Sequence, residues 1–492
     1  MKGLNKYLIQ IHNISGSLLS LMFVVWFISG IVLIFDGFPH ASRKDRFLHL
    51  TEFHKQDFEN LQAPPKSFNG KVTLELCDGK PVYRVKSGRK SQKTYDAISL
   101  KQLASFDENH AKKLSSSFNG YPVKEIEKMN ELDDWMPWSY YRPLLPLYKC
   151  KMSDPAHTVL YISEKTGEIV QETNRRARWS ARFGAIPHWI YFKKLRLAKD
   201  TWRLVIIILS SLGILMSVTG IYAGLVRLRK RKEKGISPYK KFWYKWHHLT
   251  GFFFGIFVFT FILSGLVSVT SIPDWMVGVN SKEKVDIEWN QKLELSGHKN
   301  IVPKEIFTAL NNKEGVRKIE WKTVLNTPQF RVYYDDYQKS EIYTLDDGKV
   351  IPQKKFSLAD IKQQSEEKFK NTSFSVVEQQ NYDNYYSGSA MYYMPRMAYK
   401  IEIDDVAKTW LYIDPASGER IKKLTKNTRL RRWLYRFFHT LDLAILKQYD
   451  TIRKTLLVLL SLIGLAVSIT GTRLSFKWFR RNYNKLIKTK KL

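Results

Sequence analysis

The chain has 492 residues, with 80 Lys+Arg against 46 Asp+Glu, a formal charge of +34 and a mean hydropathy of −0.32. With 26% charged and 44% hydrophobic residues, it is too hydrophobic for a disordered basic tail and too polar for a carrier that lies mostly in lipid. Its two cysteines, Cys77 and Cys150, exclude a disulfide scaffold and a cysteine-ligated cluster; whether they pair with each other stays open. No C-x-x-C-H motif for covalent haem is present.

Four uncharged stretches predict membrane-spanning helices, at residues 14–35, 204–226, 249–272 and 455–472. At a rise of about 1.5 Å per residue, such stretches cross the roughly 30 Å hydrocarbon core of a bilayer. The first is too long for a signal peptide, and no small-residue cleavage site follows it, so we expect a retained anchor.

The basic residues predict the direction of the spans. Residues 227–246 hold nine Lys or Arg and one acid, and residues 473–492 hold eight and no acid. The N-terminus adds Lys2 and Lys6. Because short basic segments stay on the cytoplasmic side, we expect a multi-pass inner-membrane protein with both termini in the cytoplasm. These charges are expected at anionic lipid, which removes the main support for nucleic-acid binding.

The chain aligns with itself, which predicts a tandem parallel repeat. One register, which places His12 on His247, covers the first and third spans. A second register, which places His188 on His439, holds without a gap from Tyr148 to Gly220. The other aligned pairs include Gly16 with Gly251, Ser29 with Ser264, Gly30 with Gly265, Gly167 with Gly418, Gly213 with Gly464, Thr219 with Thr470 and Gly220 with Gly471.

The segments between the spans predict two outward-facing α+β domains, because apolar and polar residues alternate there as in half-buried strands. Strands are expected at 71–76, 81–85 and 330–334, helices at 109–118 and 358–369, and hairpins at 159–170 and 410–421. The full division is 1–35 (N-terminus and first span), 36–181 (first outward domain), 182–226 (interfacial segment and second span), 227–246 (cytoplasmic loop), 247–272 (third span), 273–433 (second outward domain), 434–472 (interfacial segment and fourth span) and 473–492 (cytoplasmic tail).

The histidines His12 and His247 stand at the cytoplasmic ends of their spans. His12, Gly16 and Ser20 recur every four residues and so share one helix face, and the third span repeats this pattern from His247 through Gly251. A stripe of small residues is typical of tight helix packing in membranes, but it also leaves room for a flat cofactor. Spacing alone leaves both interpretations open.

His188 and His439 form a second repeat-related pair, on the outward side, shortly before the second and fourth spans. Amphipathic segments follow each of them, and we expect these to fold back onto the outer interface. Two symmetric imidazole pairs are a familiar way to hold a haem in a helix bundle, but spacing alone leaves haem ligands and structural histidines equally open. Zinc is disfavoured because no carboxylate or thiol is placed to complete its ligands. We expect the other histidines at the surface, with His248 at the interface; the rest are His40, His49, His54, His110, His157 and His298.

Several motifs together resemble the PepSY-associated transmembrane helix family, along essentially the whole chain. They are His-x-x-x-Gly opening spans that end Ser-Gly (His12 to Gly30, His247 to Gly265), Asp383-Asn-Tyr-Tyr386, Leu411-Tyr-Ile-Asp-Pro-x-x-Gly418, the Arg-rich stretch before His439, and Ser-x-Thr-Gly in the last span. The first repeat departs from the pattern at Asp133-Asp-Trp135 and Ser163-Glu-Lys165.

This resemblance implies a membrane bundle of four α-helical spans carrying two outward-facing PepSY-like α+β domains. Some members of this family are haem-containing reductases of ferric siderophores. On that resemblance His12, His247, His188 and His439 are the ligands of two haem b groups. Gly16 and Gly251 lie four residues from His12 and His247 on the same helix faces, so we expect them beside the haem between these two histidines.

We therefore expect an electron-transfer protein that reduces a ferric siderophore or another iron chelate on the outward side. No G-x-G-x-x-G fingerprint is present, so the electron donor, a quinol or a cytoplasmic reductase, is expected to be separate. The alternative is a non-enzymatic module, in which PepSY-like domains bind or regulate a peptidase and the helices only anchor them.

Overall fold

The computed structural model describes residues 2–88, 91–229, 236–284, 286–388 and 394–489. The chain forms two compact units. One comprises Met1–Phe38, Arg176–Pro273 and Asn427–Leu492, and the other comprises Pro39–Arg175 and Asp274–Lys426. Residues 230–235 and 490–492, which belong to the two basic segments predicted to be cytoplasmic, lie outside the described residues.

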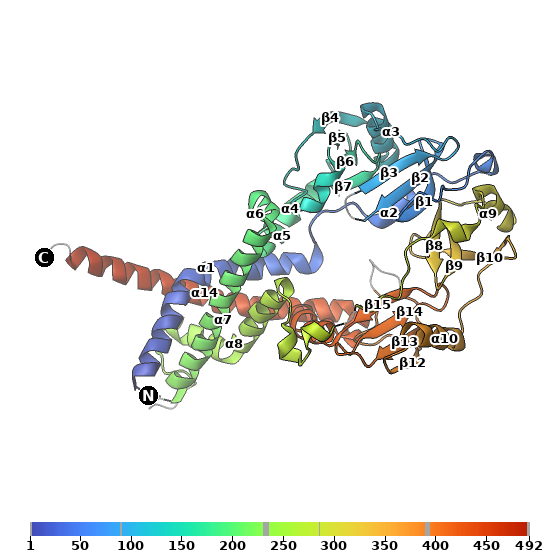
Figure 1. Cartoon of the computed structure of the whole chain (residues 1–492). Coiled ribbons are helices and arrows are strands. Elements are labelled where there is room, and N and C mark those ends of the chain that lie inside the picture. Colours follow the sequence, from blue (N-terminus) through green and yellow to red (C-terminus); the bar gives the residue numbers. More distant parts are fainter. Residues whose placement is uncertain (1, 89–90, 230–235, 285, 389–393, 490–492) are drawn as a thin grey trace. The chain divides into compact units, whose positions relative to one another are not determined.

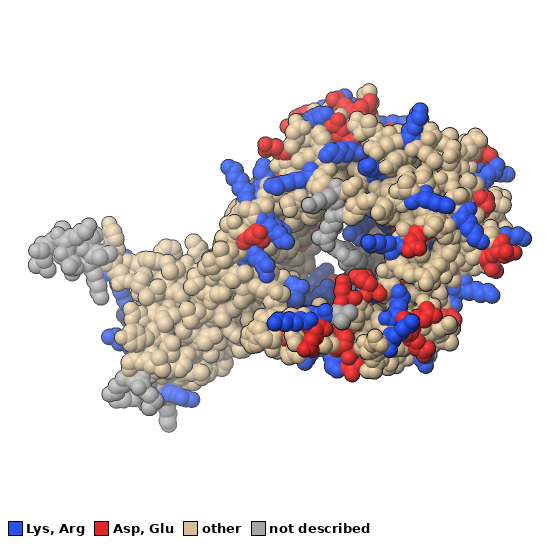
Figure 2. Space-filling view, viewed as in Figure 1, with Lys and Arg blue, Asp and Glu red and all other residues tan. Residues whose placement is uncertain are grey.

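The first unit is built on four long helices, α1 (Lys2–Phe35), α7 (Lys199–Arg229), α8 (Phe242–Val269) and α14 (Asp450–Thr489) (Figure 1). All four are long and apolar enough to cross a membrane, so the four predicted spans are confirmed. In the most apolar 18-residue stretch of each helix, only 28% of the residues are buried inside the protein, so most of these apolar side chains face outward. The surface over these helices is nearly free of charged residues in Figure 2, as a lipid-facing surface must be.

The helices pack in a ring in which α1 contacts α7 and α14, and α8 contacts the same two. Helices α1 and α8 therefore face each other diagonally. The bundle centre is filled by Leu19, Phe23, Phe27, Val258 and Ile262. Two glycines that the internal alignment pairs serve this packing: a Cβ on Gly213 would lie 2.8 Å from the ring of Phe23, and one on Gly464 would collide with the ring of Phe27.

The helices extend beyond the predicted spans. Helix α1 begins at Lys2 and α8 begins at Phe242, so neither His12 nor His247 opens its helix. Acidic residues lie in the first turns of α7 and α14 (Asp200, Asp450), and basic residues in the last turn of α7, where each sign complements the helix dipole.

Short helices lead into α7 and α14. The first series is α4 (Arg175–Phe183), α5 (Ala185–Trp189) and α6 (Lys193–Leu197). The second is α11 (Lys426–Arg431), a π-helical stretch (Arg432–Phe437), α12 (Phe438–Thr440) and α13 (Ala444–Gln448). Ile190 and Leu441 adopt left-handed backbone (φ 54° and 49°), and each follows shortly after a predicted ligand histidine. The chain turns at these two residues, so no straight helix connects His188 or His439 to the membrane-spanning helix that follows it.

The second unit holds three antiparallel sheets. Two have four strands each, in the orders β4-β5-β6-β7 and β12-β13-β14-β15. Their strands are β4 (Val123–Met129), β5 (Leu147–Met152), β6 (Val159–Ser163), β7 (Ile169–Thr173), β12 (Phe374–Gln379), β13 (Ala398–Ile403), β14 (Trp410–Ile413) and β15 (Arg420–Leu424). The helices α3 (Glu108–Asn119) and α10 (Leu358–Lys368) accompany them. The predicted hairpins and helices are confirmed, and Gly167 and Gly418 have the positive φ that the hairpin turns require.

The third sheet has seven strands in the order β11-β10-β9-β8-β1-β2-β3. They are β1 (Lys71–Cys77), β2 (Lys80–Ser87), β3 (Ser91–Asp96), β8 (Lys318–Val324), β9 (Thr327–Tyr333), β10 (Glu341–Asp346) and β11 (Lys349–Pro352). Strands β1 and β8 pair directly, with Thr73 opposite Glu320. Residues 36–181 and 273–433, treated above as two domains, therefore share one sheet and one hydrophobic core, which includes Tyr83 and Trp321.

Candidate functional site

His12 and His247 lie together inside the helical unit. Their ring centroids are 6.2 Å apart, and the rings come from the diagonal helices α1 and α8. Both rings line a cavity of about 460 Å³, whose walls come from all four long helices. The structure thus brings together two histidines from different halves of the sequence.

Hydrogen bonds fix the orientation of the rings of His12 and His247, called the inner pair because we expect them on the cytoplasmic side; His188 and His439 are called the outer pair. His12 Nδ1 lies 3.0 Å from the carbonyl oxygen of Met216, which only accepts, so Nδ1 carries the proton and donates it. His247 Nδ1 lies 3.1 Å from Thr470 Oγ1, and this hydroxyl already donates to the carbonyl of Val467 at 2.8 Å. Nδ1 of His247 is therefore also the donor. No residue that the structure describes hydrogen bonds to Nε2 of either ring, so both rings have the form of imidazole that binds a metal.

The glycines beside the inner pair have two separate roles. A Cβ on Gly220 would lie 2.6 Å from the His12 ring, and one on Gly471 would lie 3.2 Å from the His247 ring, so each imidazole rests on bare backbone. At Gly251 an added Cβ would meet no atom within 4 Å, and at Gly16 only Met216 Sδ at 3.9 Å. Gly16 and Gly251 therefore border open space in the cavity rather than a helix contact.

His188 and His439 form the second pair, with ring centroids 6.0 Å apart. They line a separate cavity of about 630 Å³ in the same unit. A Cβ on Gly30 would lie 3.3 Å from the His188 ring, and one on Gly265 would lie 4.0 Å from the His439 ring. Each of the four histidines is thus seated against a glycine, and all four glycines belong to pairs aligned by the two registers.

The outer rings are oriented in the same way as the inner ones. His188 Nδ1 lies 3.1 Å from the carbonyl of Trp26 and 3.2 Å from Ser29 Oγ. His439 Nδ1 lies 2.9 Å from Ser264 Oγ, whose hydroxyl donates to Phe261 at 2.9 Å. Burial lowers the pKa of both imidazoles to about 4, so both are neutral at pH 7 with Nε2 unprotonated.

The residues of both cavities fit a bound haem. Ring centroids 6.2 and 6.0 Å apart would leave room for one metal ion between the two imidazoles of each pair, because a metal–nitrogen bond is about 2 Å long. The walls are largely apolar, and the described residues that line them include no carboxylate or thiol that would complete a zinc site. Oriented neutral imidazoles in apolar cavities suit a planar, low-spin electron-transfer cofactor.

Three positioning residues were not identified from the sequence: Ser29, Ser264 and Thr470. A signal was present, because Ser29 aligns with Ser264 and Thr219 with Thr470. In the first half Thr219 does not reach a ring; its hydroxyl donates to the carbonyl of Met216, the group that orients His12.

Two histidines expected at the surface, His110 and His298, are buried, which corrects that prediction, and His248, expected at the interface, is buried inside the protein. His248 is buried and its Nε2 lies 3.2 Å from the carbonyl of Gly224. His298 is buried between the carbonyls of Glu294 and Lys322. His110 is buried beneath the hairpin of Gly167, whose carbonyl lies 2.9 Å from its Nε2. The carbonyls of Gly224, Lys322 and Gly167 reach these rings from 24 to 57 residues away, so the sequence around each histidine did not indicate its burial.

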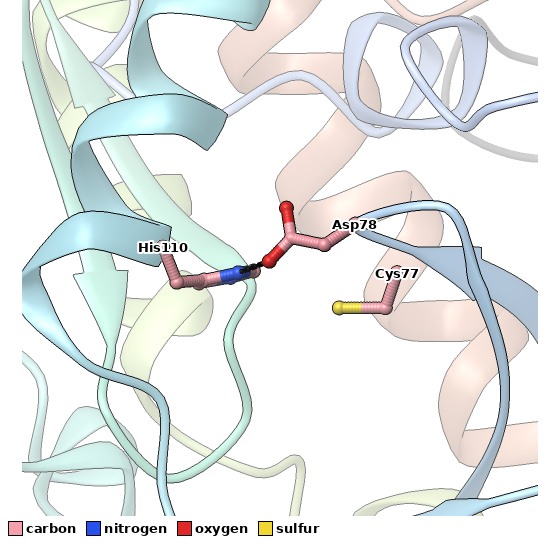
Figure 3. Close-up of side chains that lie close together, drawn as sticks. All are labelled: Cys77, Asp78 and His110. Carbon is pink, nitrogen blue, oxygen red and sulfur yellow. Dashed lines mark hydrogen bonds and ion pairs between the residues drawn. The ribbon is translucent and has the colours of Figure 1, made fainter.

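A cluster of Cys77, Asp78 and His110 has three possible metal-ligand atoms within 4.8 Å of one another (Figure 3). Both nitrogens of His110 are engaged, Nδ1 with Asp78 at 2.5 Å and Nε2 with Gly167. Burial raises the pKa of the Cys77 thiol to about 11, so it is not a thiolate at neutral pH. The cluster holds α3 against the β1–β2 turn. Neither Cys77 nor Cys150 is in a disulfide.

A family model described as PepSY-associated TM region matches residues 9–304. The match begins within α1, includes α7, α8 and three of the four paired histidines, and ends before His439. No curated protein matches the chain.

Proposed function

Because the chain belongs to the PepSY-associated TM region family, we propose that this multi-pass membrane protein transfers electrons through two haem b groups. His12 and His247 hold one haem and His188 and His439 the other. The electrons reduce ferric iron, bound as a siderophore or another chelate, on the outward side of the inner membrane. This activity would serve iron uptake.

One observation carries the proposal: each histidine pair spans a cavity with Nδ1 already used as a donor. In all four rings Nδ1 faces an oxygen that is free only to accept, at 2.9 to 3.1 Å. The ring centroids are 6.2 Å apart in the pair His12–His247 and 6.0 Å apart in the pair His188–His439. Neither packing nor helix capping requires two rings this close with both Nε2 atoms unprotonated. That combination is expected of histidines that would hold a metal and of their supporting hydrogen bonds.

The chain's own residues then have distinct tasks. The hydrogen-bond partners hold the rings at fixed orientation, and the four glycines let the imidazoles approach the helices closely. Gly16 and Gly251 leave the inner cavity open for the edge of a flat group. The central rings of Phe23 and Phe27 exclude water between the two cavities, which keeps the surroundings at low dielectric. A haem at each site would supply a one-electron Fe(III)/Fe(II) couple.

The orientation follows from charge, and we infer that the chain is a parallel tandem repeat. The basic segments 227–246 and 473–492, beside anionic lipid, would place the inner cavity near the cytoplasm. Ile190 and Leu441 have the same left-handed backbone and align in the register that places His188 on His439, which supports the repeat. The segments that form the sheets of the second unit would then be exported.

Reduction would release the iron, because siderophore oxygens bind the harder ferric ion more tightly than the ferrous ion. The electrons would come from a separate quinol or cytoplasmic reductase.

The absorption spectrum of the purified chain tests the proposal. We expect a Soret band that shifts on reduction, sharp α and β bands, and two haems per chain. Preparations supplied with excess haem that remain colourless would contradict it and favour the alternative, a PepSY-type module that binds or regulates a peptidase without redox chemistry.

A further inference from the structure

Two exposed arginines line the inner cavity and have no acidic partner in the part of the helical unit that the structure describes. Arg227, in the last turn of α7, and Arg481, on α14, both line the cavity. Among the described residues that line it, none is Asp or Glu. Neither guanidinium makes a hydrogen bond or ion pair with a residue that the structure describes, and the one acid of the neighbouring loop, Glu233, lies outside those residues.

Other donors at the same end of the cavity are also free. Tyr239 and Tyr244 line it, and their hydroxyls have no hydrogen-bond partner in the part of the chain that the structure describes. The opposite end of the cavity is apolar, with Phe23 and Val258. The cavity therefore offers a ligand one apolar end and one end with two cations and two hydroxyls.

The outer cavity differs in this respect. Its lining arginine, Arg453, is engaged, with Nε 3.0 Å from Asp450 Oδ1 and Nη1 3.0 Å from the carbonyl of Thr440. Its charge is neutralised within the first turn of α14. Unpaired guanidinium groups are thus a feature of the inner cavity and not of both cavities.

We propose that Arg227 and Arg481 bind the two propionate carboxylates of the inner haem, which deepens the proposed function and rests on it. The two arginines come from α7 and α14, the diagonal helices that do not carry the inner ligands, so they flank a group held between α1 and α8. Guanidinium groups bind carboxylates through paired charge-assisted hydrogen bonds. The propionates then point to the basic end of the cavity and the vinyl edge to Phe23.

The two cations also act on the haem iron. A positive charge near the iron favours its ferrous form, which carries one positive charge less. Removal of both guanidiniums should therefore lower the midpoint potential of the inner haem. The outer haem, with its paired arginine, should keep its potential.

The test uses the full-length chain in detergent and the double variant Arg227→Gln/Arg481→Gln. The matched control is Arg229→Gln/Arg480→Gln, which removes two neighbouring arginines that do not line the cavity. Haem content, the rate of haem transfer to excess apomyoglobin and the two midpoint potentials are measured, with the inner haem assigned by its loss in His12→Ala. A second arm supplies haem dimethyl ester, whose carboxylates are blocked.

We expect the double variant to lose the inner haem about 10- to 100-fold faster than wild type, with a lower inner potential. The control variant should match wild type, and Arg227→Lys/Arg481→Lys should recover part of the effect. The dimethyl ester should leave the inner site of wild type at least as fast as haem leaves the inner site of the double variant. The outer haem serves in each sample as the control for folding.

Equal inner-haem retention in wild type and the Gln variant would overturn the arginine assignment while leaving the proposed function intact. Tight retention of the dimethyl ester at the inner site would do the same, and would leave lipid phosphate as the partner of the arginines. A wild-type chain that binds no haem would overturn both.

Discussion

Ser264 Oγ lies 2.9 Å from Nδ1 of His439 and 2.9 Å from the carbonyl oxygen of Phe261. The hydroxyl donates to the carbonyl and so can only accept from the ring. This contact fixes the tautomer of a buried imidazole with a residue from another helix.

Ser264→Ala should therefore weaken the outer site without destroying it. The ring loses its acceptor, although the carbonyl of Phe261 remains nearby, so we expect the outer haem to dissociate up to about tenfold faster. A less basic ligand also favours ferrous iron, so the outer midpoint potential should rise. Ser268→Ala is the control, because Ser268 lines the same cavity but donates to the carbonyl of Gly265. An equal change in both variants would mean that the Ser264 hydroxyl has no special role.

Ligand substitution should separate the two sites. His12→Ala and His247→Ala should affect the same haem, which is either lost or converted to high spin. His188→Ala and His439→Ala should affect the other haem in the same way, and absorption and EPR spectroscopy measure both effects. His248→Gln is the matched control, since His248 is buried beside His247 but hydrogen bonds to Gly224. Spectra unchanged in all four alanine variants would eliminate the haem proposal.

The four spans could be predicted from the sequence because long uncharged stretches have few alternatives to a membrane. The histidine pairs could be proposed because internal alignment acts as a second copy of the sequence. The sequence could not show which of the small residues in these helices serve helix packing and which border a cavity. Their periodicity is the same whether the facing neighbour is the ring of Phe27, as at Gly464, or open space, as at Gly251.

The shared sheet could not be predicted either. Alternation in 71–76 indicates a strand, but not which edge it offers or to what. Strand β1 pairs with β8, from the other half of the chain, through only three residue pairs, such as Leu74 with Ile319. Such long-range pairing depends on how both halves fold, and no short motif records it.

The glycines at the inner cavity give a third prediction. Gly16→Leu and Gly251→Leu should fill the cavity, so surviving protein should have near-normal yield but selective depletion of the inner haem. Gly464→Leu should lower yield and thermal stability instead, because its side chain would collide with Phe27. Overpacking of this kind costs about 1–3 kcal/mol. Full inner-haem occupancy in Gly16→Leu would contradict the cofactor role.

The topology of the chain gives a fourth prediction. A reporter fused to the C-terminus should be cytoplasmic, and a tag inserted at Lys86, exposed at the end of β2, should be exported. Protease protection in spheroplasts measures both. An exported C-terminus would place the inner cavity on the wrong side of the membrane for a cytoplasmic donor.

The last prediction concerns the junction between β1 and β8. Glu320 of β8 is buried, lies 3.0 Å from Lys71 of β1 and accepts a hydrogen bond from Tyr333 at 3.1 Å. Burial alone would raise the pKa of this carboxyl, but Lys71 and Lys322 outweigh it and hold the pKa at about 2, below the ordinary 4.5. A carboxyl with a depressed pKa stabilises the fold above its unfolded pKa, and this stability is lost as the pH falls toward the folded pKa.

We therefore expect β1 and β8 to lose protection from hydrogen exchange in the full-length chain as the pH falls from about 4.5 toward 2. Intrinsic exchange rates must be corrected for pH. Glu320→Gln should remove this dependence and lower protection at neutral pH, because Lys71 then faces an uncharged amide. Glu341→Gln is the control, since Glu341 is on β10, away from the junction, and pairs with Lys313. The same pH dependence in wild type and Glu320→Gln would show that this ion pair does not stabilise the shared sheet.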